Sequence, residues 1–137
     1  MHVHGMNILA VLVSALSAFL LGGPWYSNAM FLKPWARHSR LGDNMGEKVE
    51  GKHKAMVFIL SFLFSLISAF AFAWWLGPSP ALGYAVGRGA LAGAGFVAAS
   101  FGINYQFANR SMVLWAIDGG YHTVQFILFG LILGLWH

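Results

Sequence analysis

The sequence contains no cysteine and few charged residues. The absence of cysteine excludes disulfides, thiolate metal ligands and thiol nucleophiles. Charged residues make up 9% of the chain, against roughly 25% in soluble domains. Hydrophobic residues make up 58%, so the composition is typical of a membrane protein. A chain of 137 residues has room for a single domain, residues 1–137.

The sequence also lacks the motifs of common enzyme classes. It has no hydrolase triad pattern, no glycine-rich phosphate loop and no paired carboxylates. We therefore expect no enzyme and no cofactor, although a lipid-modifying reaction with His122 as base stays open. The formal net charge of +4 comes mainly from one loop between apolar segments, so it indicates contact with the lipid bilayer and not with nucleic acid.

Four apolar segments are each long enough to cross a membrane as a helix. A membrane helix needs about 20 residues to span hydrocarbon roughly 30 Å thick. We expect the spans at residues 6–23, 55–76, 81–104 and 111–136. The sequence therefore predicts an all-α, polytopic integral membrane protein with four transmembrane helices. The few residues at 77–80 predict that spans two and three are antiparallel neighbours.

The basic loop at residues 31–54 determines the predicted orientation. It carries six of the eight Lys and Arg residues, and Arg110 precedes span four, whereas both termini carry none. Basic loops stay on the cytoplasmic side of a membrane. We expect a cytoplasmic loop 31–54, N and C termini outside, and a bacterial cytoplasmic (inner) membrane. Asn44 and Glu47 have the spacing of a capping box, which indicates a helix leading into span two. The alternative, an ordinary solvated loop, is the one we expect.

Ionisable side chains occur inside the apolar segments. Asp118, His122 and Gln125 have the spacing of one helix face in span four, and Arg88 lies in span three. A charge near the bilayer centre costs about 3 kcal/mol or more, so these residues should face the bundle interior. From the rise per residue of a helix, Arg88 should lie at nearly the same membrane depth as His122. Tilt of the helices and the length of the arginine side chain would also let it reach Asp118. We expect an intramembrane cluster in which Arg88 pairs with Asp118, bridged or relayed by His122.

Three interpretations of this cluster remain open. The opposite charges would only fix helix register, or they would mark a pathway for a proton or a small polar solute, with His122 as the titrating group. In the third interpretation, Arg88 extends outward to lipid headgroups and pairs with nothing. The leading function is transport or channel-type handling of a proton or small polar solute. The alternative is a structural or accessory subunit of a larger membrane complex.

Glycines recur where helices should approach each other closely. Span three has two small-xxx-small pairs, and span four has two adjacent glycines. The glycines expected in helix packing are Gly83, Gly87, Gly89, Gly93, Gly119 and Gly120. Because four short helices enclose little volume, we expect a homo-oligomer, namely a dimer formed through small-residue faces.

A short internal similarity links the ends of spans one and three. Residues 23–29 and 102–108 share the pattern Gly-x-x-Tyr-x-x-Ala, and Trp35 and Trp115 follow the two copies. This pattern is compatible with a parallel 2+2 repeat of a helix hairpin, as found in some transporters. The alternative is chance, since only a few positions match.

Histidines near the chain ends are weak candidates for a metal site. His2, His4 and His137 fall on the outer side in this topology, and imidazole is a common ligand of copper and zinc. We expect solvated histidines at frayed termini and no metal.

Two motifs resemble a known family. Residues 23–27 are Gly-Pro-Trp-Tyr-Ser, and residues 115–126 are Trp-x-x-Asp-Gly-Gly-Tyr-His-x-x-Gln-Phe. Together they resemble the bacterial membrane protein family catalogued as domain of unknown function 1761, over nearly the whole chain. The resemblance implies a small four-helix membrane protein without an assigned activity. We take the motif residues Trp25, Tyr26, Trp115 and Tyr121 as supporting residues of the polar cluster.

Overall fold

The computed structural model describes residues 1–38 and 51–137. Its elements in chain order are β1 (His2–Val3), β2 (Met6–Asn7), α1 (Ile8–Trp25), α2 (Leu32–His38), α3 (Gly51–Leu76), α4 (Leu82–Ala90), the π-helical segment η2 (Leu91–Ala98), α5 (Ala99–Phe107) and α6 (Met112–Leu135). The predicted all-α architecture is confirmed. The predicted capping box at Asn44 and Glu47 lies outside the described residues.

Four stretches of helix are long and apolar enough to cross a membrane. They are Ile8–Trp25, Ala55–Leu76, Leu82–Phe107 and Met112–Leu135. The predicted spans differ from these by at most three residues at any end. The chain therefore has the architecture of a multi-pass membrane protein.

A short hairpin precedes the first span. β1 and β2 pair antiparallel, and the two residues between them, His4 and Gly5, both have positive φ. Positive φ at both positions is the requirement of a tight type I′ turn. The side chain of Asn7 then accepts hydrogen bonds from the backbone N–H groups of Leu9 and Ala10, which begins α1.

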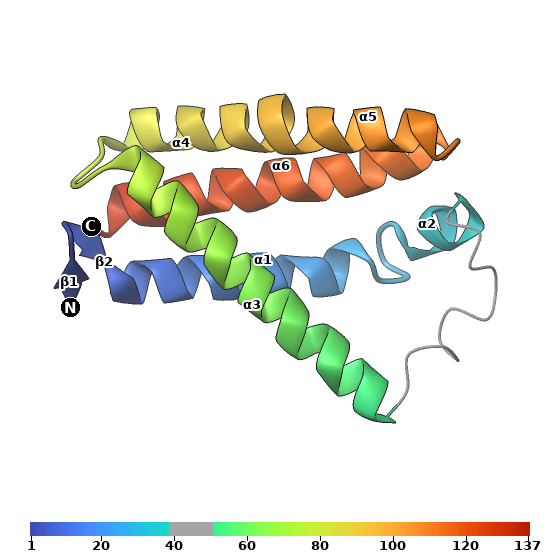
Figure 1. Cartoon of the computed structure of the whole chain (residues 1–137), viewed down its shortest axis with the longest axis horizontal. Coiled ribbons are helices and arrows are strands. Elements are labelled where there is room, and N and C mark those ends of the chain that lie inside the picture. Colours follow the sequence, from blue (N-terminus) through green and yellow to red (C-terminus); the bar gives the residue numbers. More distant parts are fainter. Residues whose placement is uncertain (39–50) are drawn as a thin grey trace.

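Three of the four spans lie side by side, and α3 crosses them obliquely (Figure 1). α6 packs most extensively on α4 and η2 and also contacts α1, whereas α3 packs mainly on α1. The prediction that spans two and three are antiparallel neighbours is therefore wrong. Gly77 and Ser79 both have positive φ, so the turn redirects the chain at an angle instead of folding α4 back along α3.

The closest helix approach is between span three and α6. A Cβ atom on Gly89 would stand 2.2 Å from the carbonyl oxygen of Phe126, and one on Gly93 would stand 2.5 Å from the Cα of Thr123. The two backbones are therefore in contact with no side chain between them, as small residues allow in membrane helices.

The other predicted packing glycines lie in different surroundings. Gly83 and Gly87 have open space at their Cβ positions within the described structure. A Cβ on Gly119 would stand 3.1 Å from a side chain of η2, and one on Gly120 would stand 3.1 Å from the ring of Trp25. Of the four predicted packing glycines of span three, Gly89 and Gly93 therefore pack against α6, whereas Gly83 and Gly87 do not.

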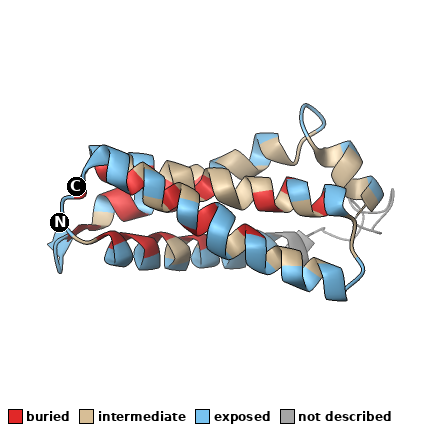
Figure 2. Cartoon of the chain, turned by 90° about the horizontal axis from the view of Figure 1, so that it is seen from above, coloured by how far each residue is buried: buried red, intermediate tan, exposed pale blue. Residues whose placement is uncertain are grey.

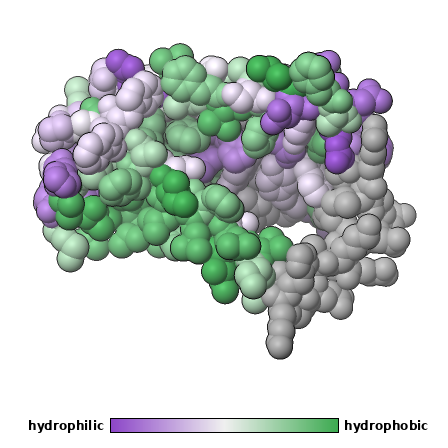
Figure 3. Space-filling model, in the orientation of Figure 1, coloured by the Kyte–Doolittle hydropathy of each residue, from purple (hydrophilic) through white to green (hydrophobic). Residues whose placement is uncertain are grey.

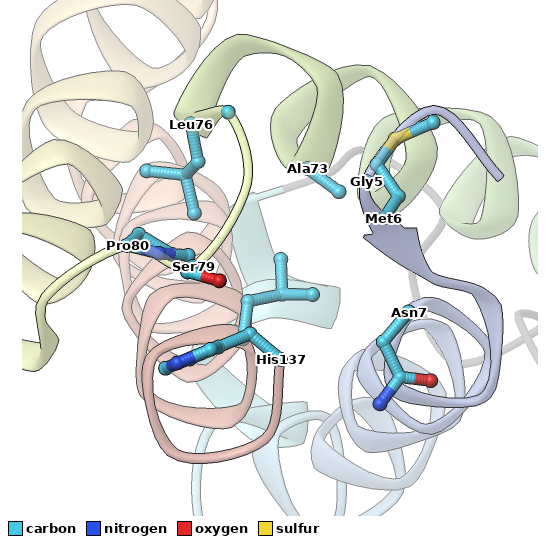
Figure 4. A pocket seen from close by; sticks show the side chains of 10 residues that line it. Gly5, Met6, Asn7, Ala73, Leu76, Ser79, Pro80 and His137 are labelled. Atoms are coloured by element: carbon cyan, nitrogen blue, oxygen red, sulfur yellow. The ribbon is translucent and has the colours of Figure 1, made fainter. Parts of the chain in front are cut away.

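The two ends of the bundle contain different elements of the chain. Both termini lie at the end of the α3–α4 turn, and α2 lies at the other end with the α5–α6 turn (Figure 1). Buried residues form inward strips along the helices, and the outward faces are exposed (Figure 2). At the termini, Asn7, Leu76, Pro80 and His137 help to line a cavity of about 10 Å³, which has room for one water (Figure 4).

Candidate functional site

Asp118 accepts hydrogen bonds from three aromatic side chains. The O–H of Tyr26 donates to Oδ1 at 2.6 Å, and Nε1 of Trp35 donates to the same oxygen at 3.1 Å. The O–H of Tyr105 donates to Oδ2. Tyr26 directly follows α1, Trp35 belongs to α2 and Tyr105 belongs to α5. One carboxylate of α6 therefore holds three other segments of the chain at the α2 end.

The surroundings of Tyr26 keep its phenol protonated, so that it acts as a hydrogen-bond donor. Burial raises the pKa of Tyr26, and the hydrogen bond to Asp118 raises it further. The phenol therefore stays protonated at physiological pH. Its ring also packs against the rings of Trp35 and Tyr121, with centroids 5.8 and 5.6 Å away.

Two further hydrogen bonds join α1 to α6. Nε1 of Trp25 donates to the carbonyl oxygen of Ile117 at 3.0 Å, and the O–H of Tyr121 donates to that of Ala18 at 2.7 Å. Gly120 allows the Trp25 ring to lie close to the α6 backbone. These contacts fix the end of α1, and with it the position of Tyr26.

Trp115 joins α6 to the π-helical segment of span three. Its Nε1 donates to the carbonyl oxygen of Ala98 at 2.7 Å. Ala98 is the last residue of η2, where the π pattern returns to α. Gly102 and Gly119 lie next to the indole and leave it room. Trp115 therefore supports the helix pair, and in the described structure its indole N–H donates to Ala98 and not to Asp118.

His122 pairs with Gln125 on the same helix. Nδ1 of His122 lies 2.6 Å from Oε1 of Gln125. Because an amide oxygen only accepts, Nδ1 is the donor in this pair, and in the neutral imidazole Nε2 then keeps its lone pair. The rings of Phe101 and Tyr121 pack edge-on against the imidazole, each with centroids 5.0 Å away. No described residue donates to Nε2, so this nitrogen is a free acceptor within the described structure.

A groove of about 940 Å³ opens between α1 and α3, and α6 forms its floor. Small-molecule sites commonly have volumes of about 300 to 1,000 Å³. The walls are largely apolar, with Phe19 and Leu20 from α1 and Phe58 and Phe64 from α3. The polar lining residues are Tyr26, Ser61, Ser65, Ser68, Tyr121, His122 and Gln125. Figure 3 shows a recess with hydrophilic colouring between apolar surfaces.

Arg88 lies apart from these residues. Its Cζ is 4.8 Å from the centroid of the Trp75 ring and 4.9 Å from that of Tyr84. No ion pair joins Arg88 to Asp118 in the described part of the chain, and none joins it to His122. The prediction that Arg88 pairs with Asp118 is therefore wrong, and so is the predicted cluster that depends on this pair. Neutral donors satisfy the carboxylate at the α2 end, whereas aromatic rings near the α3–α4 turn hold the guanidinium.

The structure divides the predicted site residues into separate groups. Tyr26 joins Asp118, and His122 joins Gln125, so the α6 face carries two neighbouring polar pairs. Tyr105 and Trp35 are not among the site residues that the sequence predicts. The internal similarity contained this signal, because both of its tyrosines bind Asp118, one at each oxygen. The duplication itself stays a prediction.

The terminal histidines lie at the end of the bundle opposite α2. His4 packs edge-on against Trp74, with ring centroids 5.8 Å apart, and His137 lines the small cavity. Across residues 1–38 and 51–137 there is no group of three His, Cys, Asp or Glu residues that could hold a metal ion.

A protein-family model matches residues 9–134, which include all or nearly all of each of the four spans. The family is described as a protein of unknown function (DUF1761). No curated protein and no solved structure matches the chain.

Proposed function

The chain belongs to the DUF1761 family, and from this premise we propose that it binds a small amphiphilic solute inside the membrane as a step of transport. One observation carries the proposal, namely the groove of about 940 Å³ with apolar walls and a floor that carries His122 and Gln125. Filling such a volume with side chains would stabilise the bundle, so a groove kept open favours a ligand.

The lining of the groove defines the chemistry of the solute. Nε2 of His122 offers a lone pair, and the hydroxyls of Ser61 and Ser68 can donate or accept. Among the described residues that line the groove there is no Asp, Glu, Lys or Arg. We therefore expect an uncharged polar group with a hydrogen-bond donor, attached to an apolar body that lies along the walls.

The basic residues suggest the side on which the solute exchanges. Lys33 and Arg37 of α2 and Arg110, which precedes α6, lie at the α2 end, which we place in the cytoplasm of a bacterium by the positive-inside rule. Gly23, Pro24 and Tyr26 line the groove near the same end. The solute would enter or leave the groove on the cytoplasmic side of the membrane.

Cysteine labelling tests whether the groove is open to water and solute. Because the sequence has no cysteine, one introduced thiol reports on one position. Ser68→Cys places the thiol in the groove, and the matched control Ile67→Cys places it at nearly the same depth on the outer surface, where Ile67 is 61% exposed. A water-soluble methanethiosulfonate reagent should label Ser68→Cys about tenfold faster in proteoliposomes, because the reactive thiolate forms where water reaches.

Equally slow labelling at both positions would show a dry groove and would contradict the proposal.

A second candidate function follows from the saturated hydrogen bonds of Asp118, which favour a structural or accessory subunit of a larger membrane complex. In that case a partner helix would cover the groove in native membranes. Ser68→Cys would then resist the reagent in native membranes and react after purification.

A further inference from the structure

We infer that Arg88, Trp75 and Tyr84 bind the phosphate of a membrane lipid at the α3–α4 end of the bundle. This site is separate from the groove and does not depend on the proposed function. The ring of Trp75 comes from α3 and that of Tyr84 from α4, and Cζ of Arg88 lies within 5 Å of both ring centroids. The rings hold the guanidinium in place through cation–π contacts. No described residue accepts a hydrogen bond from its N–H groups, so these remain available to an acceptor.

Arg88 has no carboxylate partner in the described structure. The chain contains four acidic residues, of which three lie at positions 43–50, outside the described residues. The fourth, Asp118, is bound by Tyr26, Trp35 and Tyr105 at the α2 end. An unpaired charge inside a membrane is costly, so an anion from outside the chain would complete this site.

The depth of Arg88 suits a lipid headgroup. It lies six residues after Leu82, the first residue of α4, which corresponds to about 9 Å along the helix. The guanidinium lies over Tyr84, so the side chain extends back toward the turn. An arginine stem spans roughly 6 Å, which brings the charge close to the membrane boundary.

The surroundings favour a lipid over a free phosphate ion. Leu91 lies three residues deeper on the same helix and is 48% exposed, so an acyl chain can lie against it. Gly83 and Gly87 leave open space beside Tyr84 and Arg88, where a headgroup fits without displacing a side chain. Arginine binds phosphate oxygens with two parallel N–H donors, which gives the site its chemical preference.

The test compares three additives on purified, delipidated protein in a nonionic detergent. Dioleoylphosphatidylglycerol should raise the Tm of the wild-type protein by about 4 °C or more, because it binds the folded state. Dioleoylglycerol, which lacks the phosphate, and inorganic phosphate should each leave the Tm unchanged. Arg88→Gln should lose at least half of the rise. The control Lys33→Gln, which removes an exposed cation of α2 at the other end, should keep it.

An equal rise in Arg88→Gln and in the wild type would overturn the assignment. A rise with inorganic phosphate alone would overturn the lipid as its source. If Arg88→Gln does not fold, Arg88→Lys keeps the charge and loses the paired donors, and it should lose part of the rise. An unchanged rise in Arg88→Lys would then overturn the assignment.

Discussion

Gly89→Ala is expected to destabilise the bundle by at least about 3 kcal/mol, because the new methyl group would overlap a backbone carbonyl. A Cβ at this position stands 2.2 Å from the carbonyl oxygen of Phe126, and backbone cannot move aside as a flexible side chain can. The helices would have to separate and lose the tightest contact of the fold. Unfolding in mixed detergent and sodium dodecyl sulfate, followed by circular dichroism, measures this loss.

Gly87→Ala is the matched control on the same helix. Nothing lies within 4 Å of a Cβ at Gly87, so the substitution should be neutral or stabilise by up to about 1 kcal/mol through helix propensity. Gly130→Ala should repeat the Gly89 effect from α6, because its Cβ would stand 2.2 Å from the carbonyl oxygen of Ala85. Similar stabilities for the Gly87 and Gly89 variants would contradict the observed helix approach.

Asp118→Asn is expected to cost about 3 kcal/mol of unfolding free energy. The carboxylate accepts from Tyr26, Trp35 and Tyr105, and hydrogen bonds to a charged group each contribute about 1.5–3 kcal/mol. Asparagine keeps one acceptor oxygen and turns an N–H₂ donor toward another donor. The same unfolding experiment measures the loss.

Double-mutant cycles identify the partners of Asp118. Tyr26→Phe alone should cost about 1–2 kcal/mol and should cost much less in the Asp118→Asn background, because the bond is already lost. The losses of unfolding free energy caused by Arg88→Gln and by Asp118→Asn should be additive within about 0.5 kcal/mol, since the two residues do not interact. Strong coupling between Arg88 and Asp118, with none between Tyr26 and Asp118, would contradict the structure.

The spans were predictable because hydrophobic length alone sets them. Positions 55–76 need no packing information to be recognised as a membrane helix. The oblique course of α3 was not predictable, because it depends on the backbone angles at Gly77 and Ser79 and on contacts with α1. The short helix α2 was missed because seven residues give too little hydrophobic periodicity.

The residues of the polar site were found more readily than their partners. Asp118 and His122 stood out because ionisable groups are rare in apolar segments. A comparison of membrane depth that includes only charged groups predicts Arg88 as the partner of Asp118. Tyrosine and tryptophan also donate hydrogen bonds, and three such donors lie at the end of the bundle where Asp118 is found. Trp35 and Tyr105 are uncharged and lie outside the four predicted spans, so neither stands out in the sequence as a partner of Asp118.

Photocrosslinking in cells tests most directly whether a solute occupies the groove between α1 and α3. p-Benzoylphenylalanine at position 68 would face the groove, and the same residue at position 67 would face lipid. After irradiation, mass spectrometry of the purified protein should show a small-molecule adduct at position 68 that is absent at position 67. The same bulk phospholipid adducts at both positions, and no others, would contradict a solute-binding groove.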